Sequence, residues 1–371
     1  MLGIGVVGAG IVGQVAHIAN YRQFNDCQIV ALADLRAELC RRVGERFGIP
    51  RLYRSHLELL QDPAVEAVVV VTNRPATGPV VLDALEASKQ VFSEKPMAHT
   101  LAQATRLVEA AEARNLRYAV GFMKRHDAGL QTGKRLFDAL LADGSLGKLV
   151  FARCYCFTGD FAANVDDYVM TAEQRPEGLK IWPIAPDWMP EAWVRPYAQF
   201  LNVFVHDVNT FRYVMGRTPE LLDVRLGQPT GHIVTFDFGT CLGVMELGET
   251  SVPGWHEGLE IFFEKGRLLI EFAAPLLRNA SAQVTLERAG GARETIMPAI
   301  DWSWAFRRQT EAFVKDVRTG SLPLGNGRDA LEDLRLIEEI WRRHLAAEGK
   351  PTPSLPLAGV SAPDVSRLRS A

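Results

Sequence analysis

The sequence predicts an α/β chain of two domains: a doubly wound domain with a parallel sheet, then an α+β domain with a mostly antiparallel sheet. In the first third, short apolar runs alternate with amphipathic segments, and the run Val68–Val71 is apolar at every position, as in a strand buried on both faces. After about Phe122 the runs are longer and alternate in polarity between glycine-containing turns, which is typical of an antiparallel sheet with one covered face. The 371 residues accommodate two such domains, which we place at 1–123 and 124–371.

The elements of the first domain follow in chain order from these patterns. Strands are expected in the short apolar runs Gly3–Val7, Gln28–Ala33, Ala67–Val71, Gln90–Phe92 and Arg117–Val120. Helices are expected in the amphipathic segments Ile11–Phe24, Arg36–Phe47, Ser55–Leu60, Ala76–Ala87 and Leu101–Ala113. Strands and helices that alternate in this way build a parallel sheet with helices on both faces.

The second domain is expected to begin with a helix at Gly129–Ala142. The alternating runs that predict its sheet are Lys148–Phe157, Glu220–Leu226, Gly231–Phe238, Cys241–Leu247, Leu259–Phe263, Arg267–Phe272 and Gln283–Glu287. Amphipathic segments at Phe200–Met215, Trp304–Thr319 and Asp329–Leu345 supply helices that cover one face. The tail after Gly349 is rich in Pro, Ser and Ala, and we expect it to wrap a surface or to be loose.

Composition and charge exclude several classes of function. The net charge of −3 offers no electrostatic basis for binding nucleic acid or an anionic membrane. No apolar stretch approaches the roughly 20 residues that span a bilayer. The first strand begins almost at Met1, which leaves no room for a signal peptide, so we expect a cytoplasmic protein.

The five cysteines are scattered, and their odd number argues against a disulfide framework and fits a reducing compartment. Cys154 and Cys156 stand two apart in a predicted strand and therefore share one face. No second Cys or His pair stands at the spacing of a zinc site, so we interpret both as structural thiols and expect no metal.

A glycine fingerprint follows the first strand. Gly8, Gly10 and Gly13 fit the pattern G-x-G-x-x-G at the point where a helix opens. The first glycine makes the tight turn, the second lets the backbone approach a pyrophosphate, and the third lets helix and strand pack closely. The amides at the start of the helix, including those of Ile11 and Val12, can then bind the anion. The motif predicts a Rossmann domain that binds a dinucleotide.

Asp34, at the end of the second strand, stands where a carboxylate accepts hydrogen bonds from the adenosine ribose. Its charge would repel a 2′-phosphate, which favours NAD over NADP, although Arg36 can bind that phosphate if the loop turns. Asp34 can also cap the following helix, which is compatible with the cofactor role. Further cofactor contacts are expected from Thr72, Asn73 and Glu94 at the ends of later strands.

Lys95 follows a predicted strand end in the run Glu94-Lys95-Pro96. A lysine at the carboxyl end of such a strand points toward the crevice where ligands bind, and the proline after it keeps its backbone extended. We therefore expect Lys95 beside the nicotinamide, although a lysine before proline is more often a solvated surface residue.

These residues resemble the glucose–fructose oxidoreductase / inositol dehydrogenase / MocA family. The resemblance rests on the glycine fingerprint, Asp34, Glu94-Lys95-Pro96, the run Val120–Arg125 and His206-Asp207-Val208-Asn209, and it extends over nearly the whole chain. It implies a nicotinamide domain joined to an α/β domain with a large open sheet. It also implies sugar or cyclitol substrates and oligomers, homodimers or homotetramers, formed through the open face of that sheet.

The resemblance also implies a catalytic pattern, the lysine of Glu-Lys-Pro with Asp-x-x-x-His on a helix. By position the histidine is His206, and Asn202 stands where the family has aspartate. His206 can take a hydroxyl proton near neutral pH, and Lys95 can stabilise developing alkoxide charge. Residues four apart share a helix face, so Asn202 either orients the ring or contacts substrate. Because an amide cannot stabilise imidazolium as a carboxylate does, we expect His206 to be a weaker base than in relatives with aspartate.

Two further residues are candidate substrate contacts. Arg125 follows the last strand of the first domain and either contacts substrate or pairs with an interdomain carboxylate. Trp182 lies in a stretch rich in Trp and Pro, 175–197, which we interpret as a wall over the substrate. The alternative is a rigid loop that buries its tryptophans at a subunit contact.

The sequence thus predicts an NAD-dependent oxidoreductase acting on a secondary hydroxyl of a sugar, glycoside or cyclitol, with NADP the less favoured cofactor. An alternative is a lyase or glycosidase that keeps NAD bound and oxidises the sugar transiently. A sugar-sensing regulator on the same scaffold is a third reading, but such a protein has no need of Lys95 with His206.

Overall fold

The first domain is built on a parallel sheet. The computed structural model describes residues 1–162, 165–174, 180–227, 231–251, 253–289 and 293–350. The sheet has the order β3-β2-β1-β4-β5-β6 and consists of β1 (Leu2–Val7), β2 (Cys27–Ala33), β3 (Arg51–Tyr53), β4 (Ala67–Val70), β5 (Gln90–Ser93) and β6 (Tyr118–Val120). All its neighbouring strands pair in parallel, so their carboxyl ends meet at one edge.

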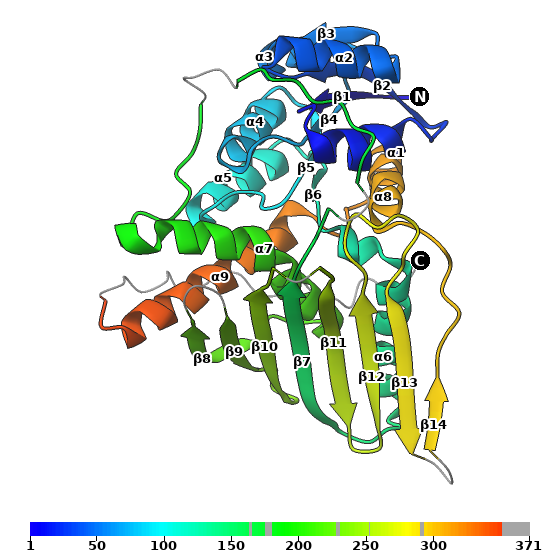
Figure 1. Cartoon of the computed structure of the whole chain (residues 1–371), viewed down its shortest axis with the longest axis vertical. Coiled ribbons are helices and arrows are strands. Elements are labelled where there is room, and N and C mark those ends of the chain that lie inside the picture. Colours follow the sequence, from blue (N-terminus) through cyan, green and yellow to red (C-terminus); the bar gives the residue numbers. More distant parts are fainter. Residues whose placement is uncertain (163–164, 175–179, 228–230, 252, 290–292, 351–371) are drawn as a thin grey trace.

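Helices cover both faces of this sheet (Figure 1). After β1 the helix runs through a π-helical segment, η1 (Gly13–Ile18), into α1 (Ala19–Tyr21), and the others are α2 (Ala37–Phe47), α3 (His56–Leu60), α4 (Arg74–Glu86) and α5 (Leu101–Glu112). Side chains of α1 and α2 share one core cluster with β1 and β2, while those of α3, α4 and α5 belong to another. The predicted doubly wound domain is therefore confirmed.

The second domain contains a larger sheet whose order is β14-β13-β12-β11-β7-β10-β9-β8 in the described residues. Only β7 and β10 pair in parallel, and the other neighbours are antiparallel. The strands are β7 (Leu149–Thr158), β8 (Glu220–Leu226), β9 (His232–Asp237), β10 (Leu242–Glu249), β11 (His256–Phe263), β12 (Gly266–Phe272), β13 (Gln283–Ala289) and β14 (Arg293–Ile296). The predicted mostly antiparallel sheet is thus confirmed.

One face of the second sheet is covered by helices. The short η2 (Met123–His126) leads into α6 (Ala128–Asp143), which packs on β12 and β13. The helix α7 (Glu191–Met215) packs on β7, and α9 (Gly327–Ala347) packs on α7 and β8. The opposite face carries ion pairs between neighbouring strands, including Arg153 with Glu246 at 2.7 Å and Arg267 with Glu287 at 2.9 Å. These two pairs place charge on the uncovered face, opposite the apolar face that packs against the helices.

The helix α8 (Ala305–Thr319) returns to the first domain. Its Phe313 lies in the same core cluster as Ile4 and meets the ring of Phe92 on β5 edge-on, with centroids 5.6 Å apart. Figure 1 shows this orange helix beside α1. One helix of the carboxyl-terminal part therefore helps to cover the parallel sheet.

Most element boundaries agree with the sequence patterns to within a few residues. Two short strands were not predicted, β3 and β14, and α7 begins at Glu191 rather than Phe200, with Pro196 inside it. The tail after Gly349 lies almost entirely outside the described residues. Among the described helices, none combines the length and the apolarity that crossing a membrane requires.

Candidate active site

The three fingerprint glycines each meet a different physical requirement. Gly8 has φ of 110°, and a Cβ on it would lie 2.2 Å from the carbonyl oxygen of Val71. A Cβ on Gly13 would lie 2.4 Å from the carbonyl oxygen of Gly8, so helix and strand approach closely there. A Cβ on Gly10 would meet nothing within 4 Å. The space beside Gly10 fits a pyrophosphate at the start of a helix.

Asp34 directly follows β2, beside this loop. Its Oδ2 accepts a hydrogen bond from the backbone amide of Ala9 at 2.8 Å, which fixes the loop against the neighbouring strand. Arg36 donates to the same carboxylate from its amide, Nε and Nη2 at 2.9 to 3.0 Å. The Arg36 side chain therefore neutralises Asp34 here and does not extend toward a phosphate.

The ends of β4 and β5 complete the same edge of the sheet. Thr72 follows β4 and shares a hydrogen bond with Thr77, while Asn73 directly precedes α4 in an extended conformation. Glu94 follows β5, and its Oε1 lies 2.8 Å from Nε2 of the buried His17 in η1. Ile11 and Val12 open the helix after Gly10. All the predicted cofactor residues thus lie along or beside one sheet edge.

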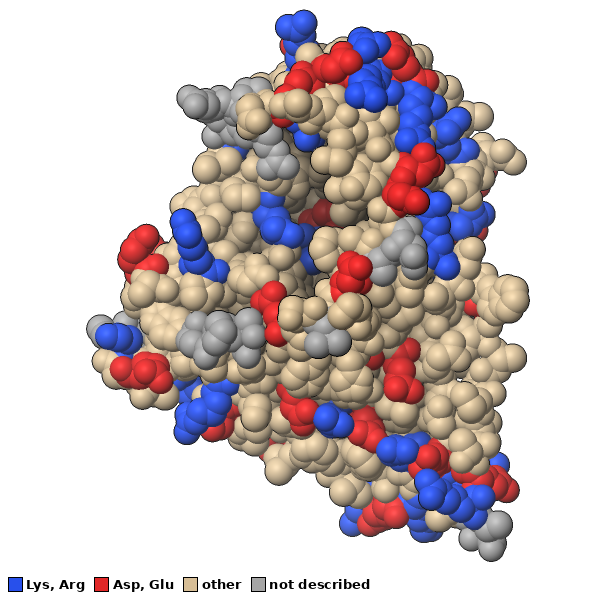
Figure 2. Space-filling model, in the orientation of Figure 1, with Lys and Arg blue, Asp and Glu red and all other residues tan. Residues whose placement is uncertain are grey.

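Lys95 joins the two domains. The peptide bond before Pro96 is cis, and the Lys95 Nζ donates a hydrogen bond of 2.7 Å to the backbone oxygen of Asn202 on α7. Asn202 and His206 stand one turn apart on that helix. The structure therefore brings Lys95, Asn202 and His206 together, as the sequence predicts. Figure 2 shows a hollow between the two domains, and both acidic and basic residues lie at its edge.

Four buried polar atoms on α7 have no hydrogen-bond partner in the described structure, and two of them belong to Asn202 and His206. The Asn202 Oδ1 and the His206 Nδ1 are both buried without a hydrogen bond in the described structure. The ring of His206 meets Phe122 edge-on, with centroids 6.2 Å apart. An unpaired buried polar group is costly, and a ligand bound beside Asn202 and His206 would supply the missing partners.

Burial and neighbouring cations change the proton affinities of the central pair. Burial, reinforced by Arg74 and Lys124 and opposed by Glu94, lowers the pKa of Lys95 to about 8. Burial, with Lys95 and Lys124 nearby, holds the pKa of His206 well below its ordinary value. At neutral pH Lys95 is therefore mostly an ammonium and His206 a neutral imidazole.

Lys124 is a charged neighbour that the sequence reasoning did not select. It lies buried in η2, pairs with Glu257 at the start of β11, and stands 5.3 Å from the ring centroid of Phe272. The Trp255 Nε1 donates to the same Glu257 at 2.7 Å. In the sequence, Lys124 could have been selected only because it stands beside Arg125, shortly after β6. No sequence pattern pointed to Glu257.

Glu257 also belongs to a buried group of three residues whose side chains offer atoms that could coordinate a metal ion. Cys156, Asp207 and Glu257 each place one such atom within 4.8 Å of the other two. The Lys124 ammonium, however, already pairs with Glu257 and supplies the positive charge. Burial raises the pKa of both the Cys156 thiol and the Asp207 carboxyl. We therefore assign no metal to the group.

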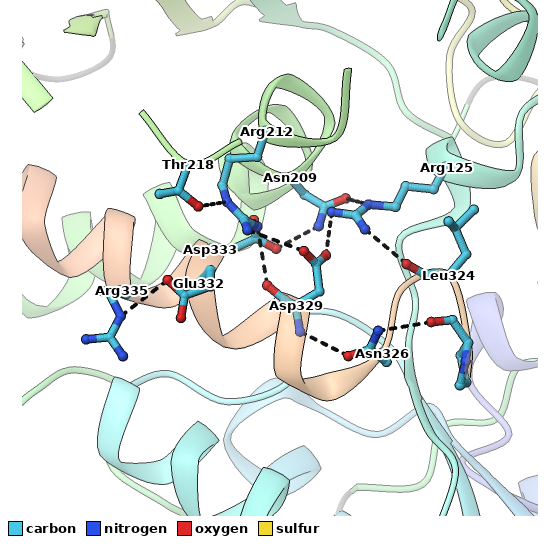
Figure 3. A network of polar contacts seen from close by, with 11 residues as sticks. Arg125, Asn209, Arg212, Thr218, Leu324, Asn326, Asp329, Glu332, Asp333 and Arg335 are labelled. Carbon is cyan, nitrogen blue, oxygen red and sulfur yellow. Dashed lines mark hydrogen bonds and ion pairs between the residues drawn. The ribbon is translucent and has the colours of Figure 1, made fainter. Parts of the chain in front are cut away.

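Arg125 points into a different network (Figure 3). Its Nε donates to Asn209 at 2.7 Å, its Nη1 donates to the backbone oxygen of Leu324 at 3.0 Å, and its Nη2 pairs with Asp329 at 2.5 Å. Arg212 continues the network to Asp333 at 2.6 Å. Arg125 therefore pairs with a carboxylate, but Asp329 lies in the same predicted domain, 124–371, so the pairing is not the interdomain one that the sequence left open. Its engaged donors give no support to the substrate contact.

Trp182 packs on the first domain. Its amide donates to the backbone oxygen of Pro75 at 2.9 Å, and a Cβ added at Gly78 would lie 2.2 Å from its ring. The neighbouring Trp188 lies under the guanidinium of Arg342 at 4.0 Å. Residues 175–179 of the Trp- and Pro-rich stretch lie outside the described residues. Among the described residues, the contacts seen for Trp182 are with α4 and with Arg106 of α5, whose guanidinium carbon lies 5.8 Å from the ring centroid, and none of them is with His206.

Comparisons with known proteins find relatives among NAD-dependent dehydrogenases. Residues 2–122 match the family model GFO_IDH_MocA, described as an oxidoreductase family with an NAD-binding Rossmann fold. A myo-inositol 2-dehydrogenase of Thermotoga maritima is 26% identical over 340 residues, 88% of this chain and 91% of its own. A scyllo-inositol 2-dehydrogenase (NAD(+)) of Bacillus subtilis is 24% identical over 83% of this chain and 84% of its own.

Solved structures share the fold. An aldose–aldose oxidoreductase from Caulobacter crescentus has a TM-score of 0.72 at 19% identity, covering 93% of this chain and 98% of that one. A 3-ketoreductase from Actinomadura kijaniata, solved with NADP, has a TM-score of 0.71 at 19% identity, with 92% and 97% covered. Together with the sequence matches, the fold and the fingerprint show that the chain is an NAD-dependent oxidoreductase, whose residues 2–122 match the oxidoreductase family of glucose–fructose oxidoreductase, inositol dehydrogenase and MocA.

Proposed function

We propose that this protein oxidises a secondary hydroxyl of a cyclitol or sugar, with Lys95 and His206 acting on that hydroxyl. The observation that carries the proposal is the meeting of Lys95, from the end of β5, with Asn202 and His206 on α7. The similarity to inositol 2-dehydrogenases over more than four fifths of the chain supports the substrate class. The glycine loop and Asp34 hold the dinucleotide at the same sheet edge.

Bound NAD⁺ supplies the acceptor for the hydride that leaves the carbinol carbon. The hydroxyl proton passes to His206, whose lowered pKa keeps the imidazole neutral and ready to accept it near pH 7. Because the Nδ1 has no protein partner, the ring can gain or reorient a proton without breaking an existing hydrogen bond there. The same low pKa makes His206 a weak base, so the proton must pass onward to solvent readily.

Lys95 stabilises the negative charge that develops on the oxygen. Its ammonium is oriented by the hydrogen bond to the Asn202 backbone oxygen and retains further donors for a substrate oxygen. A preoriented cation in a buried site is worth more to an oxyanion than one in water. Asn202 adds an unpaired amide oxygen that can accept from a neighbouring substrate hydroxyl.

A panel of inositols, sugars and glycosides with NAD⁺ tests the proposal, through the absorbance of the reduced cofactor. We expect Lys95→Met and His206→Gln each to lower kcat/KM by about 10²- to 10⁴-fold while NAD⁺ still binds. Lys134→Met, which removes a surface lysine paired with Asp138, is the matched control and should keep its activity. Full activity in Lys95→Met would refute the assignment, and substrate loss without reduced cofactor would favour the lyase alternative.

Assembly through the uncovered face of the second sheet stays a prediction. Ile233 and Leu242 are each about half exposed on β9 and β10, beside the ion pairs of that face. Apolar side chains among alternating charges suit a self-complementary contact between copies. Light scattering on the purified chain would give its mass in solution.

A further inference from the structure

A segment of the second domain lies along the cofactor domain. Residues 165–173, here named the strap, leave the sheet after β7 and run beside α1 and α2 (Figure 1). Val169 and the buried Gln14 exchange two hydrogen bonds, at 2.8 and 3.0 Å, between side-chain amide and backbone. Arg42 donates to the backbone oxygen of Met170 at 3.1 Å, and Arg46 pairs with Asp167 at 2.6 Å. The strap is therefore fixed along the length of α2.

The strap ends with a carboxylate at the first turn of α2. The Glu173 Oε1 accepts from the amide of Glu38 at 2.9 Å, and its Oε2 accepts from the amide of Leu39 at 2.8 Å. Thr171 donates to the same Oε2 at 3.2 Å. The first amides of a helix have no acceptor within the helix and attract anions. Here an anion of the protein itself already occupies them.

This position adjoins the ribose end of the dinucleotide site. The helix α2 begins at Ala37, three residues after Asp34, whose Oδ2 binds the amide of Ala9 in the glycine loop. Gln14 binds the carbonyl oxygen of the same Ala9 at 2.8 Å and also binds the strap. The two attachments of the strap, at Gln14 and at the start of α2, therefore flank Asp34.

An NADP-binding site needs positive groups where the ribose 2′-phosphate lies, beyond the position of Asp34. The nearest cation of this loop, Arg36, is engaged by Asp34 through two side-chain hydrogen bonds. The helix amides that could bind an anion here are those of Glu38 and Leu39 at the start of α2, and both already donate to Glu173. A 2′-phosphate would meet two carboxylates and would find both sets of donors in use.

We propose that Glu173 is a specificity-determining residue of the cofactor site, acting from the second domain to exclude the 2′-phosphate of NADP. The proposal rests on the NAD site of the first domain and adds to Asp34 a second carboxylate far away in the sequence. Glu173 acts in two ways, by repelling the phosphate and by occupying the amides that would otherwise bind it. The cofactor preference is then shared between the two domains.

Binding measured without substrate tests this. Dissociation constants for NAD⁺ and NADP⁺ are obtained by calorimetry for the full-length protein and for Glu173→Gln, which keeps an amide acceptor and removes the charge. We expect Glu173→Gln to tighten NADP⁺ binding about fivefold to tenfold and to leave NAD⁺ within about twofold. Asp167→Asn removes the same charge from the same strap, at the far end of α2, and should leave the ratio of the two constants unchanged.

Glu173→Lys extends the test by reversing the charge, and it should favour NADP⁺ further than Glu173→Gln does. An unchanged ratio of the two constants in both Glu173 variants, with an unchanged melting temperature, would overturn the proposal. So would an equal shift in Asp167→Asn, because the effect would then be one of general charge. If the wild-type protein binds neither dinucleotide, the proposed NAD site is wrong and the role of Glu173 is refuted with it. Failure to oxidise any polyol would refute the proposed substrate class and leave these constants valid.

Discussion

The pH dependence of oxidation reports the role of Lys95 directly. If its ammonium stabilises the substrate oxygen, kcat/KM must fall as the lysine loses its proton. Burial lowers the pKa of Lys95 to about 8, and so the fall in kcat/KM should be centred near that pH. An exposed lysine, with a pKa of about 10.4, would show no such fall until far higher pH.

The magnitude follows from the titration. With a pKa of about 8, roughly 90% of Lys95 is ammonium at about pH 7 and roughly 10% at about pH 9. We therefore expect kcat/KM to fall about tenfold between these two values. His206 adds no change in that range because its pKa lies well below its ordinary value. The acid side of the profile should stay level until the pH is low enough to protonate the imidazole.

Substitution of Glu94 should shift the falling limb of the pH profile to lower pH. The negative charge of Glu94 raises the pKa of Lys95, and so Glu94→Gln should move the falling limb to lower pH. Glu86→Gln, on an exposed glutamate at the end of α4, is the matched control and should leave it in place. The assay is the initial rate of NAD⁺ reduction at saturating NAD⁺ and constant ionic strength, over a series of polyol concentrations at each pH.

The opposite slope would refute the reasoning. A kcat/KM that rises through about pH 8 would mean that the neutral amine of Lys95 removes the hydroxyl proton. The roles of Lys95 and His206 would then be exchanged. A profile that is flat to about pH 9 would contradict the lowered pKa itself.

Two other substitutions test the surroundings of the site. Asp333→Ala leaves the buried Arg212 without its 2.6 Å partner in the network of Figure 3, and we expect a loss of about 3–5 kcal/mol in the free energy of unfolding, measured with denaturant. A loss below about 1 kcal/mol would show that Asp329 alone satisfies Arg212. Asn202→Asp places an anion one helical turn from His206 and beside Lys95, which should raise both pKa values and move the falling limb of the pH profile to higher pH. An unmoved limb would mean that the residue 202 side chain faces away from both groups.

The fold was largely predictable because strong periodicities define its long elements. The strand β3 escaped because it has three residues and pairs with β2 alone, and β14 escaped because its four residues are all exposed. The sequence did not reveal that α7 begins as early as Glu191, because Pro196 follows shortly after and a proline normally argues against a helix interior. In each case the tertiary context decided what the local pattern could not.

The site was predictable where the residues lie at strand ends and less so elsewhere. Lys95 and Asp34 follow predicted strands, and the topology of a parallel sheet places such residues at one edge. The Lys124–Glu257 pair joins residues more than a hundred positions apart. No local pattern reveals such a partner, nor the attachment of Glu173 to the start of α2.

The packing of α8 has a consequence for how the chain reaches its native state. Phe313 and Val314 complete the apolar core on one face of a sheet whose last strand ended nearly two hundred residues earlier. A ribosome-bound chain that stopped at residue 123 would leave the part of that face under α8 uncovered and open to aggregation. The nucleotide half can therefore complete this part of its core only when the final third of the polypeptide has been synthesised.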